Sequence, residues 1–212
     1  GQLTLGAGAD ASTDGRLSLD DLEGARIDLL TLVTEELGGA GVDIDTPHPW
    51  IVCLQHPVTS EAHDAGAQMT ETLRALTAFE RYRILVFWPG EDAGAGAMSK
   101  VIRQSQAPVE WLHTVRNLPP SRFLRLLTQA VVLVGNSSAG IRECSALGVP
   151  VVNVGSRQQG RERGPNMIDV PHDAQAIAQA IRQQIAHGRY EPSSLYGDGN
   201  SGERIAEVLL GL

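Results

Sequence analysis

The chain has 212 residues, enough for one large or two small domains, and 42% of them are hydrophobic, as is usual in globular proteins. Its net charge of −8 and its aromatic content of only 4% argue against a nucleic-acid-binding surface. An anion bound by such a chain must be small and must be held by local arginines and backbone amides. The two cysteines lie in apolar runs and the histidines lack metal-ligand spacing, so neither a disulfide framework, a metal site nor a cofactor is expected.

Membrane insertion and secretion are not expected either. The sequence contains no apolar run of about 18 residues, the length that would begin to suggest a membrane-spanning helix. Its N-terminus also lacks the basic-then-apolar order of a signal peptide. The cytoplasm is therefore the expected compartment.

Residues 1–49 are predicted to lead into a single domain that covers residues 50–212. The first 16 residues are rich in Gly, Ala, Asp and Ser and have little periodic apolarity, so we expect a loop there. Ser18 and Asp21 then resemble a capping box, and apolar residues follow at helical spacing. This pattern predicts a helix that ends at Gly38 and Gly39.

The rest of the chain alternates short apolar runs with helical patterns. Strands are predicted at residues 50–55, 83–88, 109–113, 131–135, 150–154 and 166–170. Helices are predicted at residues 59–80, 93–105, 121–129, 138–147, 173–187 and 202–210. Continuous apolar strands and this alternation indicate an α/β fold, a Rossmann-like parallel sheet of about six strands with helices on both faces.

Polar clusters follow four of the predicted strands. They are His56–Thr59, Glu91–Gly94, Arg116–Asn117 and Asn136–Ser138. Each alone is weak evidence, because strand-to-helix loops are normally polar and begin with cap residues. In open α/β sheets, however, ligands bind beyond the carboxyl ends of the strands. Recurrence of the clusters on that one edge predicts a ligand cleft.

The stretch from Val131 to Val170 is the most informative part of the chain. A buried strand runs into the turn that contains Ser137, Ser138 and Gly140, and a helix start offers free backbone N–H groups to an anion. Either serine would also serve simply as an N-cap, and Gly140 leaves room for phosphate oxygens to approach the backbone. Glu143 either favours the helix dipole or accepts hydrogen bonds from vicinal sugar hydroxyls. With a phosphate at the helix start, the second alternative indicates a nucleotide.

Arg157, Arg161 and Arg163 follow the fifth strand in a glycine-bounded loop. They form either a solvated surface cluster or a closing loop with Gly160 and Gly164 as hinges, in which one arginine pairs with phosphate. His56 is either a surface or capping histidine or a candidate for acid, base or phosphate contact, because it follows a strand at the same edge.

Three segments together resemble the hydrolysing UDP-N-acetylglucosamine 2-epimerases of the sialic acid branch. They are QHPVTSE, FWPGEDAGAGAM and GNSSAGIRECSALGVPVVNVGSRQQGRERGPNMIDV, and they occur in the order that the family shows. The resemblance runs from about Trp50 to the C-terminus. It implies a two-domain, glycosyltransferase-B-like fold, of which this chain resembles the C-terminal, UDP-binding half.

The resemblance also implies roles for individual residues. Ser137 and Ser138 would bind the diphosphate, Glu143 the ribose hydroxyls, and Arg157 would act at the closing loop. His56 would approach the phosphates or the departing UDP as the catalytic candidate of this chain. Asn117, within the Arg116–Leu118 segment, would lie near uracil. Gly90 stands where family members often carry an amide side chain, so that contact would be absent here.

The implied reaction is elimination of UDP to a glycal, followed by addition of water to give the free sugar inverted at C2. Elimination needs a base at C2, and in this family the acid and base carboxylates lie in the N-terminal domain. We therefore expect no epimerase turnover from this chain alone. The alternatives are a non-catalytic module that binds nucleotide sugars and a transferase domain of the glycosyltransferase-B type.

The expected partners are a UDP-sugar and the cleft-facing half that this sequence lacks. A half of a two-domain protein exposes its cleft and its inter-domain surface, so a homodimer is the other expected partner for that face.

Overall fold

The computed structural model describes residues 49–105, 111–198 and 200–211. The helix predicted over residues 18–37 lies outside the described residues, as does almost all of the 1–49 lead-in. No helix in these ranges is long and apolar enough to cross a membrane.

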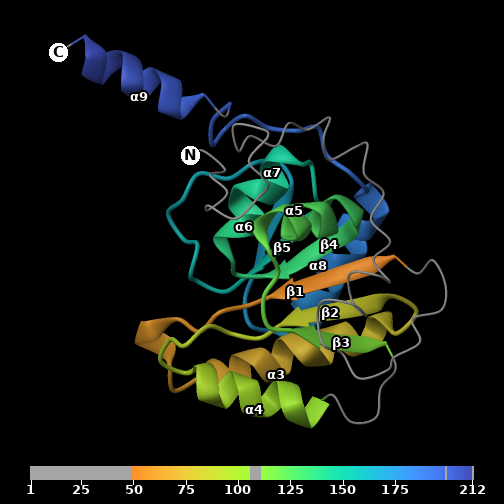
Figure 1. Ribbon diagram of the computed structural model, residues 1–212. Helices are drawn as coiled ribbons and strands as arrows, with labels where there is room; N and C mark the ends of the chain where they lie inside the picture. Colours follow the sequence, from red (N-terminus) through yellow and green to blue (C-terminus); the bar gives the residue numbers. More distant parts are fainter. Residues whose placement is uncertain (1–48, 106–110, 199, 212) are drawn as a thin grey trace.

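One parallel sheet of six strands forms the centre of the molecule (Figure 1). Its strands are β1 (Trp50–Leu54), β2 (Arg83–Phe87), β3 (Leu112–Val115), β4 (Ala130–Gly135), β5 (Val151–Val154) and β6 (Met167–Val170). They are arranged in the order β3-β2-β1-β4-β5-β6. The strand order reverses between β1 and β4, so the carboxyl ends of these two strands flank the switch point where such sheets bind ligands.

Helices cover both faces of the sheet. The α-helices of the described residues are α3 (Ala65–Leu76), α4 (Ala95–Ser105), α5 (Pro120–Gln129), α6 (Ser138–Ile141), α7 (Glu143–Ala146), α8 (Ala174–His187) and α9 (Ser201–Leu210). Two 3-10 turns, η1 (Thr59–Glu61) and η2 (Thr77–Phe79), flank α3. Figure 1 shows α9 projecting away from the rest of the fold, with the C-terminus at its far end.

Alternation along each strand divides the core into two layers. Ile51 and Cys53 of β1 pack in the cluster that includes α3, α4 and α8, whereas Trp50 and Val52 pack in the cluster that includes α5. Side chains of successive strand residues point to opposite faces, so an uninterrupted apolar run supplies both layers at once. The α/β, Rossmann-like class predicted from the apolar runs is confirmed.

Both cysteines belong to this core and are free. Burial raises the pKa of the Cys53 thiol to about 12, and it also raises the pKa of Cys144. A thiol is nucleophilic only as the thiolate, so both act as small apolar side chains.

Three predicted elements differ from the structure. The helix expected over residues 59–80 is divided into η1, α3 and η2. The helix expected over residues 138–147 is interrupted at Arg142, whose φ of −97° and ψ of −74° end α6 and begin α7. The strand expected over residues 109–113 is β3, Leu112–Val115, which extends beyond His113 because Phe87 of β2 pairs with Val115; residues 109 and 110 lie outside the described residues.

The buried histidine His113 should make the stability of the fold depend on pH. Its side chain is 8% exposed, its ring centroid lies 5.7 Å from that of Trp50, and its Nε2 has no hydrogen-bond partner among the described residues. Burial, and secondarily the charge of Arg83, lower the pKa of His113 below its ordinary 6.5. The unfolded chain therefore binds a proton more readily than the folded chain, and this contribution to stability is lost as the pH falls below 6.5.

We expect His113→Phe to reduce the loss of stability that the protein shows between about pH 7.5 and about pH 5.5. Urea unfolding at both pH values measures this difference. His63→Gln is the control, because it removes an exposed histidine that lies outside the core. An unchanged pH dependence in His113→Phe would contradict the assignment.

Candidate functional site

Asn136 joins the loops that follow β1 and β4. Its Oδ1 accepts a hydrogen bond from the backbone N–H of His56 at 2.7 Å, and its Nδ2 donates to the carbonyl of His56 at 2.8 Å. Its own backbone N–H donates to Leu54 O at 3.2 Å. The Asn136 side chain is 1% exposed, so this pair of hydrogen bonds fixes the backbone of His56 at the switch point.

The same residue also anchors the loop after β5. The carbonyl oxygen of Asn136 accepts hydrogen bonds from Arg157 Nη1 at 3.2 Å and from Gln158 Nε2 at 2.7 Å. Gln158 is 1% exposed, whereas Arg157 is exposed. Asn136 therefore brings His56 and Arg157, which are 101 positions apart in the sequence, to one place at the edge of the sheet.

A second link joins the same two loops. Ser156 Oγ donates to Glu61 Oε1 at 2.5 Å, and Gln68 Nε2 donates to Glu61 Oε2 at 2.7 Å. These two hydrogen bonds, that of Ser156 first, lower the pKa of the Glu61 carboxyl. Glu61 is thus ionised at neutral pH and ties the loop of Arg157 to the loop of His56.

His56 is half-buried and lies near one charge of each sign. Burial lowers its pKa most, the positive charge of Arg157 lowers it further, and the negative charge of Asp92 opposes both. The imidazole is therefore neutral at pH 7 without a ligand. A bound anion would raise the pKa of His56 and favour the protonated, donating form.

Ser137 and Ser138 begin α6, and the structure separates their roles. Ser137 is the N-cap, with its Oγ accepting a hydrogen bond from Ala139 N at 3.3 Å. In the part of the chain that the structure describes, the half-buried hydroxyl of Ser138 has no hydrogen-bond partner. Of the two hydroxyls, that of Ser138 is thus the more available to a ligand.

Gly140 was expected to leave room for a phosphate, and the structure gives it another role. A Cβ at Gly140 would lie 2.9 Å from Cγ1 of Val151. The glycine therefore allows α6 to pack closely on β5, and the ligand-approach interpretation is wrong for this position.

Glu143 is the first residue of α7 and is half-buried. Its Oε2 is buried and has no hydrogen-bond partner among the described residues. A buried carboxylate oxygen without a donor is costly in free energy.

The three arginines of the β5–β6 loop do not act as one cluster. Arg157 and Arg161 are exposed. Arg163 instead donates to Asp169 Oδ1 at 2.8 Å and to the Gln158 carbonyl at 2.9 Å, so its guanidinium holds the loop itself. Gly164 is buried, and a Cβ there would lie 2.4 Å from Ser145 Oγ, so close packing is sufficient to explain this glycine.

Asn117 lies at the end of β3, which is an edge strand. It is exposed, and its Oδ1 accepts a hydrogen bond from Leu118 N at 3.0 Å. No described hydrogen bond joins Asn117, Ser138 or Glu143 to the group around Asn136. The structure thus brings His56 and Arg157 together through Asn136, whereas Ser138 and Glu143 begin α6 and α7 and Asn117 follows β3.

Sequence reasoning did not single out Glu61, Ser156 or Gln158. Glu61 lies in the QHPVTSE segment and Ser156 directly precedes Arg157, so both were close to recognised positions. Their contact spans 95 residues, and no local pattern indicates it.

Comparison with known proteins settles the family. The family model of UDP-N-acetylglucosamine 2-epimerase matches residues 15–210. This chain belongs to that family. The resemblance seen in the three loop segments is therefore confirmed. The division at residue 49 remains a prediction, and the family match begins well before it.

Two epimerase relatives show how much of the family this chain represents. A UDP-N,N'-diacetylbacillosamine 2-epimerase (hydrolyzing) of Legionella pneumophila is 32% identical over 160 residues, which are 74% of this chain and 42% of that protein. A UDP-N-acetylglucosamine 2-epimerase of Neisseria meningitidis is 32% identical over 161 residues, again 74% and 42%. The chain thus spans less than half the length of these curated relatives.

A solved epimerase structure shares the fold. The UDP-GlcNAc 2-epimerase of Methanocaldococcus jannaschii, determined in complex with UDP-GlcNAc and UDP, superposes with a TM-score of 0.65 at 12% identity. The superposition covers 92% of this chain and 52% of that one.

Proposed function

We propose that this chain is the UDP-binding part of a hydrolysing UDP-N-acetylglucosamine 2-epimerase. The observation that carries the proposal is the junction at Asn136, which holds His56 and Arg157 together at the switch point beside the start of α6. A diphosphate at this edge would have three groups to bind: the imidazole of His56, the exposed guanidinium of Arg157 and the hydroxyl of Ser138.

Each candidate residue would contact a different part of UDP. Ser138, supported by Ser137, would bind the diphosphate at the start of α6, and Arg157 would pair with it from the adjoining loop. The half-buried carboxylate of Glu143 would accept hydrogen bonds from the ribose hydroxyls. Asn117, or the backbone beside it, would lie near the base.

His56 has a role that follows from its electrostatics. It is neutral before the ligand binds, and the negative charge of the diphosphate raises its pKa. In the protonated form it would donate a hydrogen bond to the leaving phosphate as the glycosidic C–O bond breaks. This stabilises the departing UDP, which is one of the two requirements of elimination.

The other requirement is the base that removes the C2 proton. This chain spans 42% of the curated epimerases that it matches, and we propose that the base belongs to the remaining half. The name of the Legionella relative supports the hydrolysing type of reaction, in which water adds to the glycal and the free sugar is released. The substrate would then be a UDP-linked N-acetylated hexosamine.

Isothermal titration calorimetry with UDP tests the proposal. We expect the chain to bind UDP, and Ser138→Ala and Glu143→Gln each to weaken binding by roughly tenfold, which is about 1.4 kcal/mol. Each change removes one polar contact that the proposal assigns to the ligand.

The matched controls are Ser194→Ala and Glu207→Gln, which alter exposed residues of the C-terminal tail and of α9. They should bind UDP like the unmodified chain. Absence of a heat signal at millimolar UDP, with the protein shown to be folded, would refute the proposal.

A further inference from the structure

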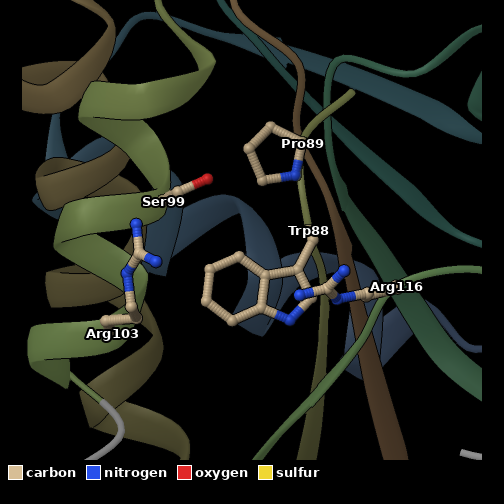
Figure 2. A pocket seen from close by; sticks show the side chains of 5 residues that line it. All are labelled: Trp88, Pro89, Ser99, Arg103 and Arg116. Carbon is tan, nitrogen blue, oxygen red and sulfur yellow. The ribbon is translucent and has the colours of Figure 1, made fainter. Parts of the chain in front are cut away.

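A pocket of about 520 Å³ lies beside the carboxyl ends of β2 and β3 (Figure 2). Its lining residues are Trp88, Pro89, Ser99, Arg103 and Arg116. The volume falls within the roughly 300–1,000 Å³ of typical small-molecule sites. Figure 2 shows Ser99 and Arg103 reaching in from α4 and Arg116 from the end of β3, with the ring of Trp88 between the two arginines.

The polar side chains of this pocket are mostly donors. Each guanidinium offers N–H groups and no acceptor, and the Ser99 hydroxyl is able to donate as well. Within residues 49–105, 111–198 and 200–211, neither Arg103 nor Arg116 forms an ion pair with a carboxylate. Two arginines that lack a described acidic partner thus lie beside one cavity in a chain of net charge −8.

Trp88 restricts the motion of the side chains that line the pocket. Its backbone N–H donates to Val115 O at 2.9 Å, which continues the β2–β3 ladder, and its indole is half-buried. The guanidinium carbon of Arg103 lies 5.7 Å from the centroid of the Trp88 ring. This cation–π contact limits the motion of Arg103 before any ligand arrives and so lowers the entropic cost of binding.

We propose that this pocket binds a small organic anion through a phosphate or carboxylate group held by Ser99 and Arg103 of α4, on one side of the Trp88 ring, with the positive charge of Arg116 on the other side. The oxyanion accepts hydrogen bonds from the Arg103 guanidinium and from the Ser99 hydroxyl, the charge of Arg116 adds to the attraction, and the organic part lies against Trp88 and Pro89. Its lining residues include none of the residues that the proposed function assigns to UDP, so this proposal does not depend on the proposed function.

NMR spectroscopy of the ¹⁵N-labelled chain tests this site directly, because each tryptophan gives one indole N–H signal. Trp50 and Trp111 lie at the amino ends of β1 and β3, away from the pocket, and act as internal controls. Titration with inorganic phosphate, and separately with citrate, at constant ionic strength is expected to shift the Trp88 signal and leave the other two in place. The two probes show whether phosphate or carboxylate is preferred.

Arg103→Gln should abolish the Trp88 shift. The matched control is Arg182→Gln, because Arg182 is also an exposed arginine stacked on an aromatic ring, that of Phe79 at 5.6 Å, on a different helix. This control should leave the shift unchanged. Both substitutions are on the surface, and the dispersion of the amide signals shows that each variant is folded.

Two results would overturn the proposal. The first is a Trp88 signal that does not move with either probe at millimolar concentration, or that moves equally in Arg103→Gln. The second is loss of the phosphate-induced shift when UDP saturates the chain, because Asn117 adjoins Arg116 and the pocket would then be part of the nucleotide site. If the chain does not bind UDP at all, a specific Trp88 shift still supports the pocket.

Discussion

Replacing Gly135 with alanine is expected to lower the free energy of unfolding by roughly 3–5 kcal/mol. Gly135 ends β4 with a φ of +135°, and a Cβ there would lie 2.2 Å from Leu54 O and 2.5 Å from Leu54 C. The obstructing atoms belong to the backbone of β1, so no side-chain rotation relieves the contact. The change therefore separates the two strands at the switch point.

Two other glycines make this prediction specific. Gly160→Ala also carries a positive φ, of +78°, but nothing lies within 4 Å of the added Cβ, so the cost should be about 1 kcal/mol. Gly96→Ala lies in α4 with open space around it and should change stability by less than about 1 kcal/mol, in the stabilising direction. Urea unfolding of the three variants measures the series. Equal losses at Gly135 and Gly160 would show that the steric contact is unimportant.

Asn136→Asp is expected to cost about 3 kcal/mol and to weaken UDP binding at least roughly tenfold. The substitution keeps the shape of the side chain but replaces the Nδ2 donor, which bonds His56 O, with a second acceptor. Two oxygens then face each other in a buried place. The new negative charge also lies beside the proposed diphosphate position and repels it.

The pH dependence of this variant separates loss of the hydrogen bond from general disruption. Burial beside a carbonyl raises the pKa of the introduced carboxyl, so the folded variant binds a proton more readily than the unfolded chain. The stability deficit relative to the unmodified chain should therefore shrink as the pH falls from 7 towards about 5. Asn200→Asp, at the exposed start of α9, is the control and should change stability by less than about 0.5 kcal/mol. A deficit that does not depend on pH would contradict the assigned geometry.

The elements that could be predicted from the sequence are those with a local signature. The apolar runs of β1, β2, β4 and β5 identified buried strands within one residue at each end, because a strand covered on both faces needs apolar side chains throughout. Helix α8 was placed within one residue because its Asp173 N-cap and terminal Gly188 are local signals. The break at Arg142 had no such signal, since neither proline nor a special turn residue marks it.

Some residues of the candidate site could also be predicted from the sequence, and others could not. His56, Ser138 and Arg157 were recognisable because polar residues after apolar strands collect at the carboxyl edge of any parallel sheet. The functions of Gly140, Gly164 and Arg163 were not, because each depends on what lies across the fold: Val151 for Gly140, Ser145 for Gly164, and Asp169 for Arg163. A glycine for close packing and a glycine for ligand approach look identical in a sequence.

Local patterns in this chain were thus sufficient to predict the sequence order of strands and helices, the parallel sheet, the edge at which a ligand is expected and the family resemblance. They depend on periodicity and on neighbouring residues, which sequence displays directly. The tertiary structure alone decided that Asn136 joins three loops, that Glu61 and Ser156 meet, and that Trp88, Arg103 and Arg116 enclose a pocket. These contacts join segments that only the folded sheet brings together, and hydrogen bonds across such distances leave no periodic trace in the chain.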